Sequence, residues 1–373
     1  MKDPRVKEFA EVLVNHSTKV KPGNKVLIEV FDTPHEVTLA IVEEVFAAGG
    51  IPLIEMKSNR VQRALYMSGD DDFFKLAADC ELYRMKQMDC YIAVRGIWND
   101  KEFVDIPGGQ MSKFEKLWLK PVHFDERVAN TRWVVTRFPS PSYAQKAKMS
   151  FEAFENFFFR ACTGVDWEKM SNAMDKMVAL MQKTDKVRLV AKGTDLTFSI
   201  KGIKPVKCAG QYNVPDGEIF TAPVRESVNG VIHYNTPSSY RGFTFENIEL
   251  TFKDGKIVNA AANDTERINE IFDTDEGARY VGEFALGVNP YVDQPMDEVL
   301  FDEKISGSIH FTPGNAYIEA DNGNKSSIHW DLVLIQTEEY GGGEIYFDDT
   351  LIRKDGVFIV DELKGLNPEN LRA

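Results

Sequence analysis

A strand–helix–strand pattern near the N-terminus constrains the fold of this chain more than any other feature. Residues 25–30 (KVLIEV) and 51–56 (IPLIEM) are short β-rich runs. Between them, residues 32–34 (DTP) supply a capping side chain and a proline for a helix start. Gly49 and Gly50 end that helix. Because two strands joined through a helix pair in parallel, we expect a parallel sheet.

The same alternation continues beyond the second strand. We expect a helix over residues 70–86, a strand over 91–95, a helix over 110–130 and a strand over 133–138. Pro121 must break or kink the second of these helices. This part of the chain is therefore predicted to be a doubly wound α/β domain. It contains no GxGxxG and no GxxxxGK[ST], so nothing points to a dinucleotide or a nucleoside triphosphate.

The second half of the chain has a different character. A helical stretch over residues 143–186 is followed by β-rich runs with hairpin-like spacing, such as 187–191 and 248–252. We place the domain boundary near residue 184. The prediction is an N-terminal α/β domain over residues 1–184 and an α+β, mainly antiparallel domain over residues 185–373.

The overall charge limits the classes of partner. The chain has 373 residues, with 44 lysines and arginines against 58 aspartates and glutamates, and a net charge of −14. This balance argues against nucleic acid and anionic membrane as partners, because both require concentrated basic surface. No signal peptide or membrane-spanning run is evident, and the four cysteines are irregularly spaced without CxxC. We expect a cytoplasmic protein with reduced thiols.

Two of the six histidines fall in one predicted hairpin. Residues 328–332 (IHWDL) alternate between apolar and polar, so His329 and Asp331 share one face of a strand. A neighbouring strand carries His310, and residues 322–324 (NGN) suit the turn between them. A single His-x-Asp is common and carries little information alone. Two imidazoles and a carboxylate on paired strands, however, have the chemistry of a metal site.

Two glutamates of the second half lie beside small or apolar neighbours. Glu218 follows a Pro/Gly turn at the start of an apolar run, and Glu283 stands in VGEFALG. A carboxylate without a partner would be costly to bury in such surroundings. Taken singly, and from composition alone, each is interpreted as a solvated turn residue.

Four blocks in the second half carry a family resemblance. In this order and spacing, PDGEIFTAP, VGEFALGVNP, FDEKISGSIH and SSIHWDLV resemble the signature blocks of the thermophilic-type metallo-aminopeptidases, the aminopeptidase T and aminopeptidase S family. The likeness extends upstream through RWVVTRFPSPSYAQKAKMSFEAF and KGTDLTFSI, and so covers most of the chain. The resemblance implies a two-domain, usually dimeric exopeptidase with a pair of divalent metals in its C-terminal domain.

The resemblance also implies a ligand set. By position, the family's metal-binding residues match Glu218, Glu283, His310, His329 and Asp331, with Glu283 as the bridge between two ions. Oxygen and nitrogen ligands without a thiolate suit Zn²⁺, Co²⁺, Mn²⁺ or Mg²⁺. Two such ions would lower the pKa of a water between them and polarise the scissile carbonyl.

Two further residues are candidates for catalysis. The family's active-site tyrosine matches Tyr317, which could donate a hydrogen bond to the developing oxyanion. Without the family match, Tyr317 is better interpreted as a packed tyrosine after a turn. Glu303 is a possible proton shuttle between water and the leaving amine. A salt bridge between Glu303 and Lys304 or another base is an equally good interpretation.

The sequence thus predicts a cytoplasmic, two-metal aminopeptidase that removes N-terminal amino acids from peptides. Two alternatives remain open: a metal-dependent hydrolase of other amides or esters, and a metal- or peptide-binding protein without turnover. The first would hydrolyse esters or non-peptide amides but not aminoacyl substrates, and the second would bind metal without hydrolysis. A homodimer is expected from the resemblance alone.

Overall fold

The computed structural model describes residues 3–373, and these divide into two compact units. The first unit comprises the described residues up to Thr163 together with the later segment Gly210–Val214. The second unit comprises Gly164–Ala209 and Pro215–Ala373. The sequence-based division at residue 184 falls between the helix that ends at Met181 and the strand that begins at Lys186. That division remains a prediction.

The first unit is built on a five-stranded parallel sheet, as the strand–helix–strand pattern predicts. Its strand order is β2-β1-β3-β4-β8, and every pairing is parallel. The strands are β1 (Lys25–Phe31), β2 (Ile51–Lys57), β3 (Cys90–Arg95), β4 (Arg132–Arg137) and β8 (Asn213–Val214).

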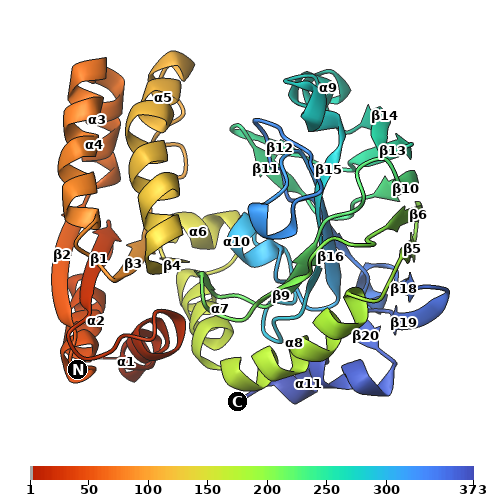
Figure 1. Ribbon diagram of the computed structural model, residues 1–373, viewed down its shortest axis with the longest axis horizontal. Helices are drawn as coiled ribbons and strands as arrows, with labels where there is room; N and C mark the ends of the chain where they lie inside the picture. The colour runs from red at the N-terminus through yellow and green to blue at the C-terminus, as the bar shows by residue number, and fades with distance from the viewer. Residues whose placement is uncertain (1–2) are drawn as a thin grey trace. The chain divides into compact units, whose positions relative to one another are not determined.

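Helices cover both faces of this sheet, which makes the unit doubly wound (Figure 1). On one face, Leu27 of β1 packs with Met85 and Tyr91. Val26 and Ile28 point to the opposite face and are equally buried, because successive strand residues alternate. The helical segments are α1 (Pro4–Glu11), η1 (Val12–Ser17), α2 (His35–Ala47), α3 (Asn59–Ser68), α4 (Asp71–Met85), α5 (Gly108–Phe114), η2 (Glu115–Val128), α6 (Pro141–Lys146) and α7 (Phe151–Thr163).

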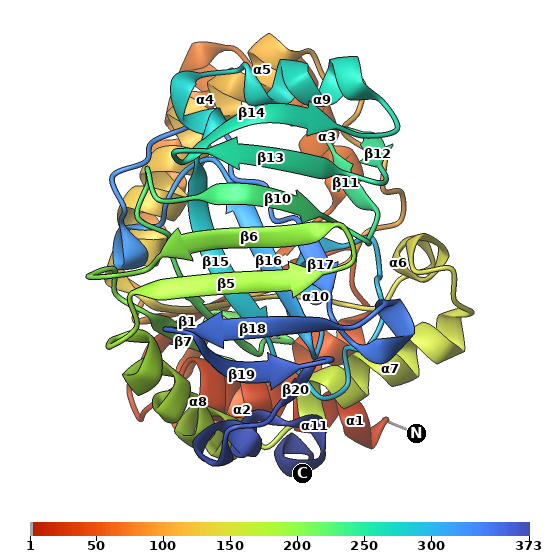
Figure 2. The same ribbon diagram turned by 90° about the vertical axis from the view of Figure 1, so that its right-hand side faces the viewer.

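The second unit contains a large antiparallel sheet, seen face-on in Figure 2. The strand order is β14-β13-β10-β6-β5-β18-β19-β20. In chain order its strands are β5 (Lys186–Ala191), β6 (Thr194–Ser199), β10 (Asn229–His233), β13 (Glu249–Lys253), β14 (Lys256–Ala261), β18 (Gly343–Phe347), β19 (Thr350–Lys354) and β20 (Val357–Phe358).

A smaller antiparallel sheet of the second unit carries the candidate site. Its order is β17-β16-β15-β9-β7, formed by β7 (Val206–Cys208), β9 (Glu218–Thr221), β15 (Val281–Gly287), β16 (Ser308–Pro313) and β17 (Val333–Ile335). The remaining elements are α8 (Trp167–Met181), β11 (Ser238–Tyr240), β12 (Phe243–Phe245), α9 (Thr265–Phe272), η3 (Glu276–Arg279), α10 (Val299–Asp302), η4 (Ile318–Ala320), η5 (Glu338–Tyr340), η6 (Asp361–Leu366) and α11 (Pro368–Leu371).

Aromatic side chains join the two sheets of the second unit. The ring of Phe198 on β6 lies 5.0 Å from Phe284 on β15 and 5.0 Å from Phe311 on β16. Since strand side chains alternate, the neighbours Glu283 and His310 point to the opposite face of the small sheet. The apolar core thereby fixes which face the polar side chains occupy.

The predicted strand over residues 328–332 is not a regular strand. Regular pairing joins β16 to β17, and residues 328–332 precede β17 as an extended segment. The ladder loses regularity because Pro313 has no N–H to donate and Gly314 adopts a φ of +111°. Antiparallel contact nevertheless continues through three backbone hydrogen bonds: Phe311 N–H to the carbonyl of Leu332, Trp330 N–H to that of Pro313, and Asn315 N–H to that of Ile328.

The predicted alternation within this segment is kept. Ile328, Trp330 and Leu332 are buried, while His329 and Asp331 retain partial exposure. The expected turn at residues 322–324 is a bend within a longer connection that also contains η4.

Three helical predictions differ in detail from the structure. The single helix over residues 143–186 is instead α6, α7 and α8, and Lys148 at a φ of +56° stands in the first gap. Pro121 does not end its helix, because the chain passes it in the wider π-helical turns of η2. Asp32 does not cap α2; its carboxylate accepts a hydrogen bond from the N–H of Asn59.

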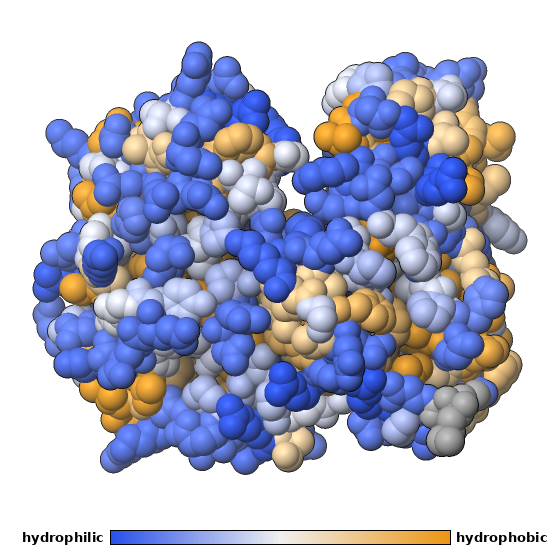
Figure 3. All heavy atoms as spheres, turned by 180° about the vertical axis from the view of Figure 1, so that it is seen from behind, coloured by the Kyte–Doolittle hydropathy of each residue, from blue (hydrophilic) through white to orange (hydrophobic). Residues whose placement is uncertain are grey.

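Among the described residues, no helix is long and apolar enough to cross a membrane. The face turned away from the viewer in Figure 1 is largely hydrophilic, with hydrophobic atoms gathered in smaller patches (Figure 3). This surface agrees with the charged composition of the chain.

Candidate metal centre

Three adjacent strands of the small sheet bring two glutamates and a histidine together. Glu218 begins β9, Glu283 lies on β15, and His310 lies on β16. The Nε2 atom of His310 is 3.0 Å from Oε1 of Glu283 and 3.4 Å from Oε2 of Glu218. All three side chains are buried. Ala285, paired with His310 across the strands, leaves room for this cluster because its side chain is small.

The extended segment before β17 adds a second imidazole and a third carboxylate. His329 Nε2 lies 3.2 Å from Oδ1 of Asp331 and 3.5 Å from Oε2 of Glu283. Glu283 therefore contacts a different histidine with each of its two oxygens. The cluster consists of two groups of three ligands that share Glu283, and within each group the ligand atoms lie within 4.8 Å of one another.

Neighbouring polar groups orient the ligands. Nδ1 of His329 donates to the backbone carbonyl of Asn315 at 2.8 Å, which leaves Nε2 facing the carboxylates. The hydroxyl of Thr312 donates to Oδ1 of Asp331 at 2.7 Å. Sequence reasoning missed both Asn315 and Thr312. The one available signal was that Thr312 stands two residues after His310 and so shares its face of the strand.

Lys304 is fully buried beside the cluster. Its Nζ lies 2.6 Å from Oε1 of Glu218, 2.5 Å from Oε1 of Glu303 and 3.6 Å from Oδ1 of Asp216. The predicted salt bridge between Glu303 and Lys304 is therefore present. Lys304 holds one oxygen of Glu218 and leaves the other directed toward His310.

The buried groups of the cluster have pKa values that differ from their ordinary values. Burial raises the pKa of Glu283 above its ordinary value. Burial alone would lower the pKa of His310, but the hydrogen bond and charge of Glu283 together with Glu218 raise it to about 9. Burial likewise opposes the rise for His329, whose pKa the charges of Asp331 and Glu283 bring to about 10. The carboxylates of the cluster therefore favour positive charge beside them.

The same residues fit a divalent cation. Oε2 of Glu218 and Oε2 of Glu283 are buried and, among the described residues, have no hydrogen-bond partner. Leaving such oxygens unpaired is costly, and a cation removes that cost. The donors are carboxylate oxygens and imidazole nitrogens, the ligand types that Zn²⁺, Co²⁺ and Mn²⁺ accept in proteins.

The two predicted catalytic residues lie at this cluster. Glu303 forms a further group with His310 and Asp331 whose ligand atoms are within 4.8 Å of one another. Burial raises the pKa of Glu303 to about 8, against the lowering effect of Lys304. The ring of Tyr317 lies 4.6 Å from that of His329 and is 47% exposed, so it lies at the open side. The structure thus brings together all seven residues singled out in the sequence, while their individual roles remain predictions.

Comparisons with known proteins agree on one family. A family model described as thermophilic metalloprotease (M29) matches residues 2–353. The chain is 24% identical to aminopeptidase PepS of Streptococcus thermophilus over 385 residues, covering 88% of this chain and 91% of that protein. It is 30% identical to aminopeptidase T of Thermus aquaticus over 264 residues, covering 60% and 64% respectively.

Solved structures share the fold. AmpT from Thermus thermophilus matches with a TM-score of 0.81 at 21% identity, over 96% of this chain and 99% of that one. A 2,5-dihydroxypyridine dioxygenase from Pseudomonas putida KT2440 matches with a TM-score of 0.62 at 14% identity, over 96% and 98%. Since the second neighbour is named for a different reaction, the fold alone does not assign an activity.

Proposed function

The chain belongs to the thermophilic metalloprotease (M29) family, and from this membership we propose that its metal-dependent aminopeptidase activity uses two divalent ions held by one shared carboxylate. The contacts of Glu283 carry this proposal, because its two oxygens face two different histidines. A carboxylate placed in this way is suited to bridge two cations.

We assign the ligands as follows. One ion would be held by Glu218, Glu283 and His310, and the other by Glu283, His329 and Asp331, because the ligand atoms within each of these groups lie within 4.8 Å of one another. Zn²⁺, Co²⁺, Mn²⁺ and Mg²⁺ all suit such donors, and availability as much as affinity decides among them. When bound, the ions supply positive charge that polarises the scissile carbonyl and acidifies a water molecule.

Glu303 is the proposed proton carrier. It takes a proton from the attacking water and delivers it to the leaving amine, as a general base and then a general acid. Its place beside His310 and Asp331 supports this role. The contact with Lys304 at 2.5 Å fixes Oε1 of Glu303 and so orients the carboxylate.

Tyr317 is the proposed donor to the developing oxyanion. Its ring rests on His329 at 4.6 Å and on Phe220 at 5.9 Å. These two contacts orient the ring at the open side of the cluster. A hydroxyl held there donates to negative charge that forms only in the transition state.

The proposed substrates are peptides with a free N-terminus, rather than nucleic acids or membrane lipids. A net charge of −14 disfavours polyanionic partners. We propose a cytoplasmic location, because all four cysteines of the chain are free thiols. We also propose that residues 185–373 form the catalytic domain, since all seven site residues fall in that range.

We propose further that two chains associate through strand β2. This strand is at the edge of the parallel sheet. Its side chains Ile51, Leu53, Ile54 and Met56 are nevertheless between 41% and 55% exposed. Apolar side chains on both faces are typical of a strand with neighbours on both sides. Sedimentation equilibrium should give a dimer for the unaltered chain and a monomer for Ile54→Lys.

The experiment that tests the activity is hydrolysis of aminoacyl-p-nitroanilides by metal-stripped protein. Adding back Zn²⁺, Co²⁺, Mn²⁺ or Mg²⁺ should restore cleavage of substrates with a free α-amine, and N-acetylated substrates should remain intact. Cleavage of esters or acetylated amides without cleavage of aminoacyl substrates would instead support a hydrolase of other amides or esters. Metal binding without any hydrolysis would support a protein that binds and does not turn over.

A further inference from the structure

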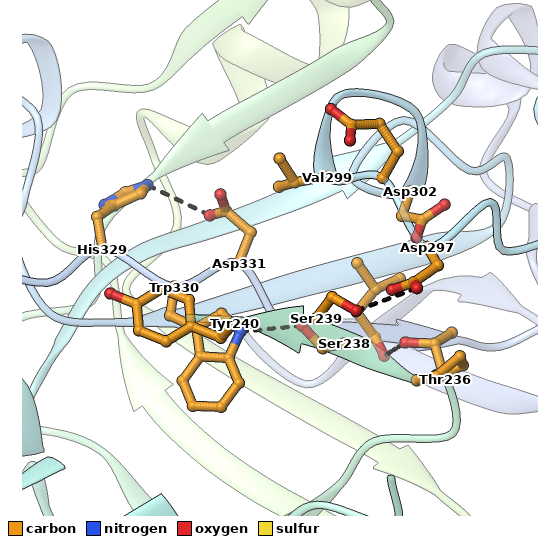
Figure 4. Close-up of a pocket in the computed structure, with 13 residues that line it drawn as sticks. Thr236, Ser238, Ser239, Tyr240, Asp297, Val299, Asp302, His329, Trp330 and Asp331 are labelled. Carbon is orange, nitrogen blue, oxygen red and sulfur yellow. Dashed lines mark hydrogen bonds and ion pairs between the residues drawn. The ribbon is translucent and has the colours of Figure 1, made fainter. Parts of the chain in front are cut away.

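A turn at residues 314–316 holds the ring of His329. The carbonyl of Asn315, in the middle of this turn, accepts the 2.8 Å hydrogen bond from Nδ1 of His329. Figure 4 shows the opposite side of the ring, where Nε2 lies 3.2 Å from Oδ1 of Asp331. Because the hydrogen bond at Nδ1 fixes the tautomer and the plane of the ring, the position of the Asn315 carbonyl decides where Nε2 points.

The turn lies against the strand that carries Glu283. A Cβ atom at Gly282 would be 2.3 Å from the carbonyl oxygen of Asn315, so the turn comes this close only because residue 282 is glycine. The turn itself begins with Gly314, at a φ of +111°. Since glycine has many accessible backbone conformations, hydrogen bonds from outside the turn are needed to fix Asn315.

Asn324 supplies these hydrogen bonds. Its Nδ2 donates to the carbonyl of Gly314 at 2.6 Å and to that of Gly277 at 2.9 Å. Its backbone carbonyl accepts a hydrogen bond from the N–H of Ala316 at 3.1 Å. The side chain and the main chain of Asn324 together therefore hold the residues on both sides of Asn315.

The surroundings of Asn324 fix its side chain in one orientation. Between residues 321 and 327 it alone is buried, with 1% exposure. Its Oδ1 accepts from Nε of Arg225 at 3.0 Å, and the guanidinium of Arg225 lies 3.6 Å from the ring centroid of Tyr280. The carbonyl of Tyr280 accepts from the N–H of Gly314 at 2.7 Å, so these contacts close back on the turn. Because its amide donor and its oxygen are both bonded, the amide cannot rotate without losing hydrogen bonds.

We propose that Asn324 is a positioning residue for the metal centre: by holding the turn at residues 314–316, it sets the direction of Nε2 of His329. The proposal rests on the proposed function, in which His329 is a ligand of one of two ions. The other proposed ion has no contact with His329. Asn324 should therefore influence the binding of one ion and not that of the other.

The test is calorimetric titration of metal-stripped protein with Zn²⁺. Asn324→Ala should weaken one of the two binding steps by about tenfold, the lower end of the range for a group that supports a ligand, and leave the other step unchanged. The Zn²⁺ concentration that gives half-maximal cleavage of leucyl-p-nitroanilide should rise by the same factor. Asn324→Asp is the second variant, because it keeps the shape of the side chain and the acceptor for Arg225 but lacks the amide donor. It should show the same selective loss.

The matched control is Asn269→Ala. Nδ2 of Asn269 also donates to two backbone carbonyls, those of Ala260 and Thr265, and its Oδ1 accepts from Nη2 of Arg279. These groups belong to β14, α9 and η3, and none is part of the turn or of a proposed metal site. The control should leave both binding steps unchanged.

Equal weakening of both steps in the Asn324 variants would overturn the proposal, since that pattern indicates a general structural role. Unchanged affinities in either folded variant, or the same shift in Asn269→Ala, would also overturn it. A single binding step in the unaltered chain would overturn the proposed pair of ions and, with it, the selective effect of Asn324. Calorimetry does not depend on turnover, so absence of cleavage of every aminoacyl substrate would overturn the proposed activity alone.

Discussion

Each unit of the molecule contains three carboxylates close together, and the two clusters balance their charge differently. In the first unit, Glu29, Glu55 and Glu81 have oxygens within 4.8 Å of one another. Nζ of Lys57 lies 2.7 Å, 3.6 Å and 2.8 Å from them respectively. Tyr91 adds a hydrogen bond to Glu29 at 2.5 Å. A cation of the chain itself occupies this cluster.

The buried lysine of the second cluster contacts only some of its carboxylates, Glu218, Glu303 and Asp216. Lys304 contacts Glu218 there, but Glu283 and Asp331 have only histidines as basic partners among the described residues. An ammonium group on a flexible stem supplies a point charge that is always present, whereas imidazole nitrogens act as ligands when neutral. The comparison teaches that grouped carboxylates do not by themselves make a metal site. What distinguishes the proposed metal site is its imidazole nitrogens and its buried carboxylate oxygens that, among the described residues, have no hydrogen-bond partner.

The largest expected effect is loss of activity on removing one ligand of the second cluster. His329→Ala should reduce kcat/KM for a leucyl substrate by about a thousandfold or more, the upper end for loss of one group that stabilises the transition state. The control is His233→Ala, which removes a half-buried histidine on β10 that pairs with Glu249 at 3.9 Å. Similar activities of His329→Ala and His233→Ala would contradict the proposed metal-binding role of the second cluster.

Removing the cation of the first cluster should instead affect stability. Lys57→Met leaves buried carboxylates without their partner, and we expect a loss of about 3–5 kcal/mol in the free energy of unfolding. Urea denaturation of metal-free protein measures this loss. Metal content of the folded variant should equal that of the unaltered chain. A variant that kept its stability by binding a divalent ion at the first cluster would show that the two clusters are interchangeable.

The first cluster should also make the protein sensitive to acid. Burial alone would raise the pKa of Glu29, but the charges of Lys57 and Arg127 hold it at about 2, below its ordinary value of 4.5. A carboxylate whose pKa is lowered by folding contributes stability that is complete above pH 4.5 and is lost as pH falls toward 2. We expect about 3 kcal/mol to be lost over that interval. Lys57→Met should flatten this part of the pH–stability curve, and an unchanged slope would contradict the assignment.

The smallest expected effect is the loss of metal affinity on removing the Thr312 hydroxyl, which donates a hydrogen bond to the proposed ligand Asp331. Thr312→Val removes the hydroxyl that donates to Asp331 at 2.7 Å and keeps the shape of the side chain. Metal affinity should fall by roughly 10–100-fold, with a smaller change in stability. Thr197→Val on β6 is the matched control, because that hydroxyl donates to a backbone carbonyl in the large sheet. Calorimetric titration with Zn²⁺ compares the two variants.

Much of the fold follows from local pattern. The parallel strands of the first unit are apolar runs separated by helices, so their pairing follows from periodicity and connection alone. Strand β8 was not foreseen, because it has two residues and its partner on β4 is about 80 positions away in the chain. The breaks in the helical stretch over residues 143–186 depend on local geometry such as the positive φ of Lys148.

The candidate site likewise has features that follow from local sequence and features that do not. Alternation along β15 and β16 explains why Glu283 and His310 lie on the face opposite Phe284 and Phe311. The identity of the ligands came from the resemblance of four sequence blocks. Thr312 shares a strand face with His310, whereas the contact of Asn315 with His329 depends on how an irregular segment lies against β16, and no local signal encodes that contact.

The measurement that tests the central claim most directly is the number of metal ions bound per chain. Elemental analysis of protein dialysed against Zn²⁺ should give two ions for the unaltered chain, one for His329→Ala and fewer than one for Glu283→Ala. This order follows because His329 serves one proposed site and Glu283 serves both. One ion in the unaltered chain, or two ions retained by Glu283→Ala, would contradict a pair of ions that shares this carboxylate.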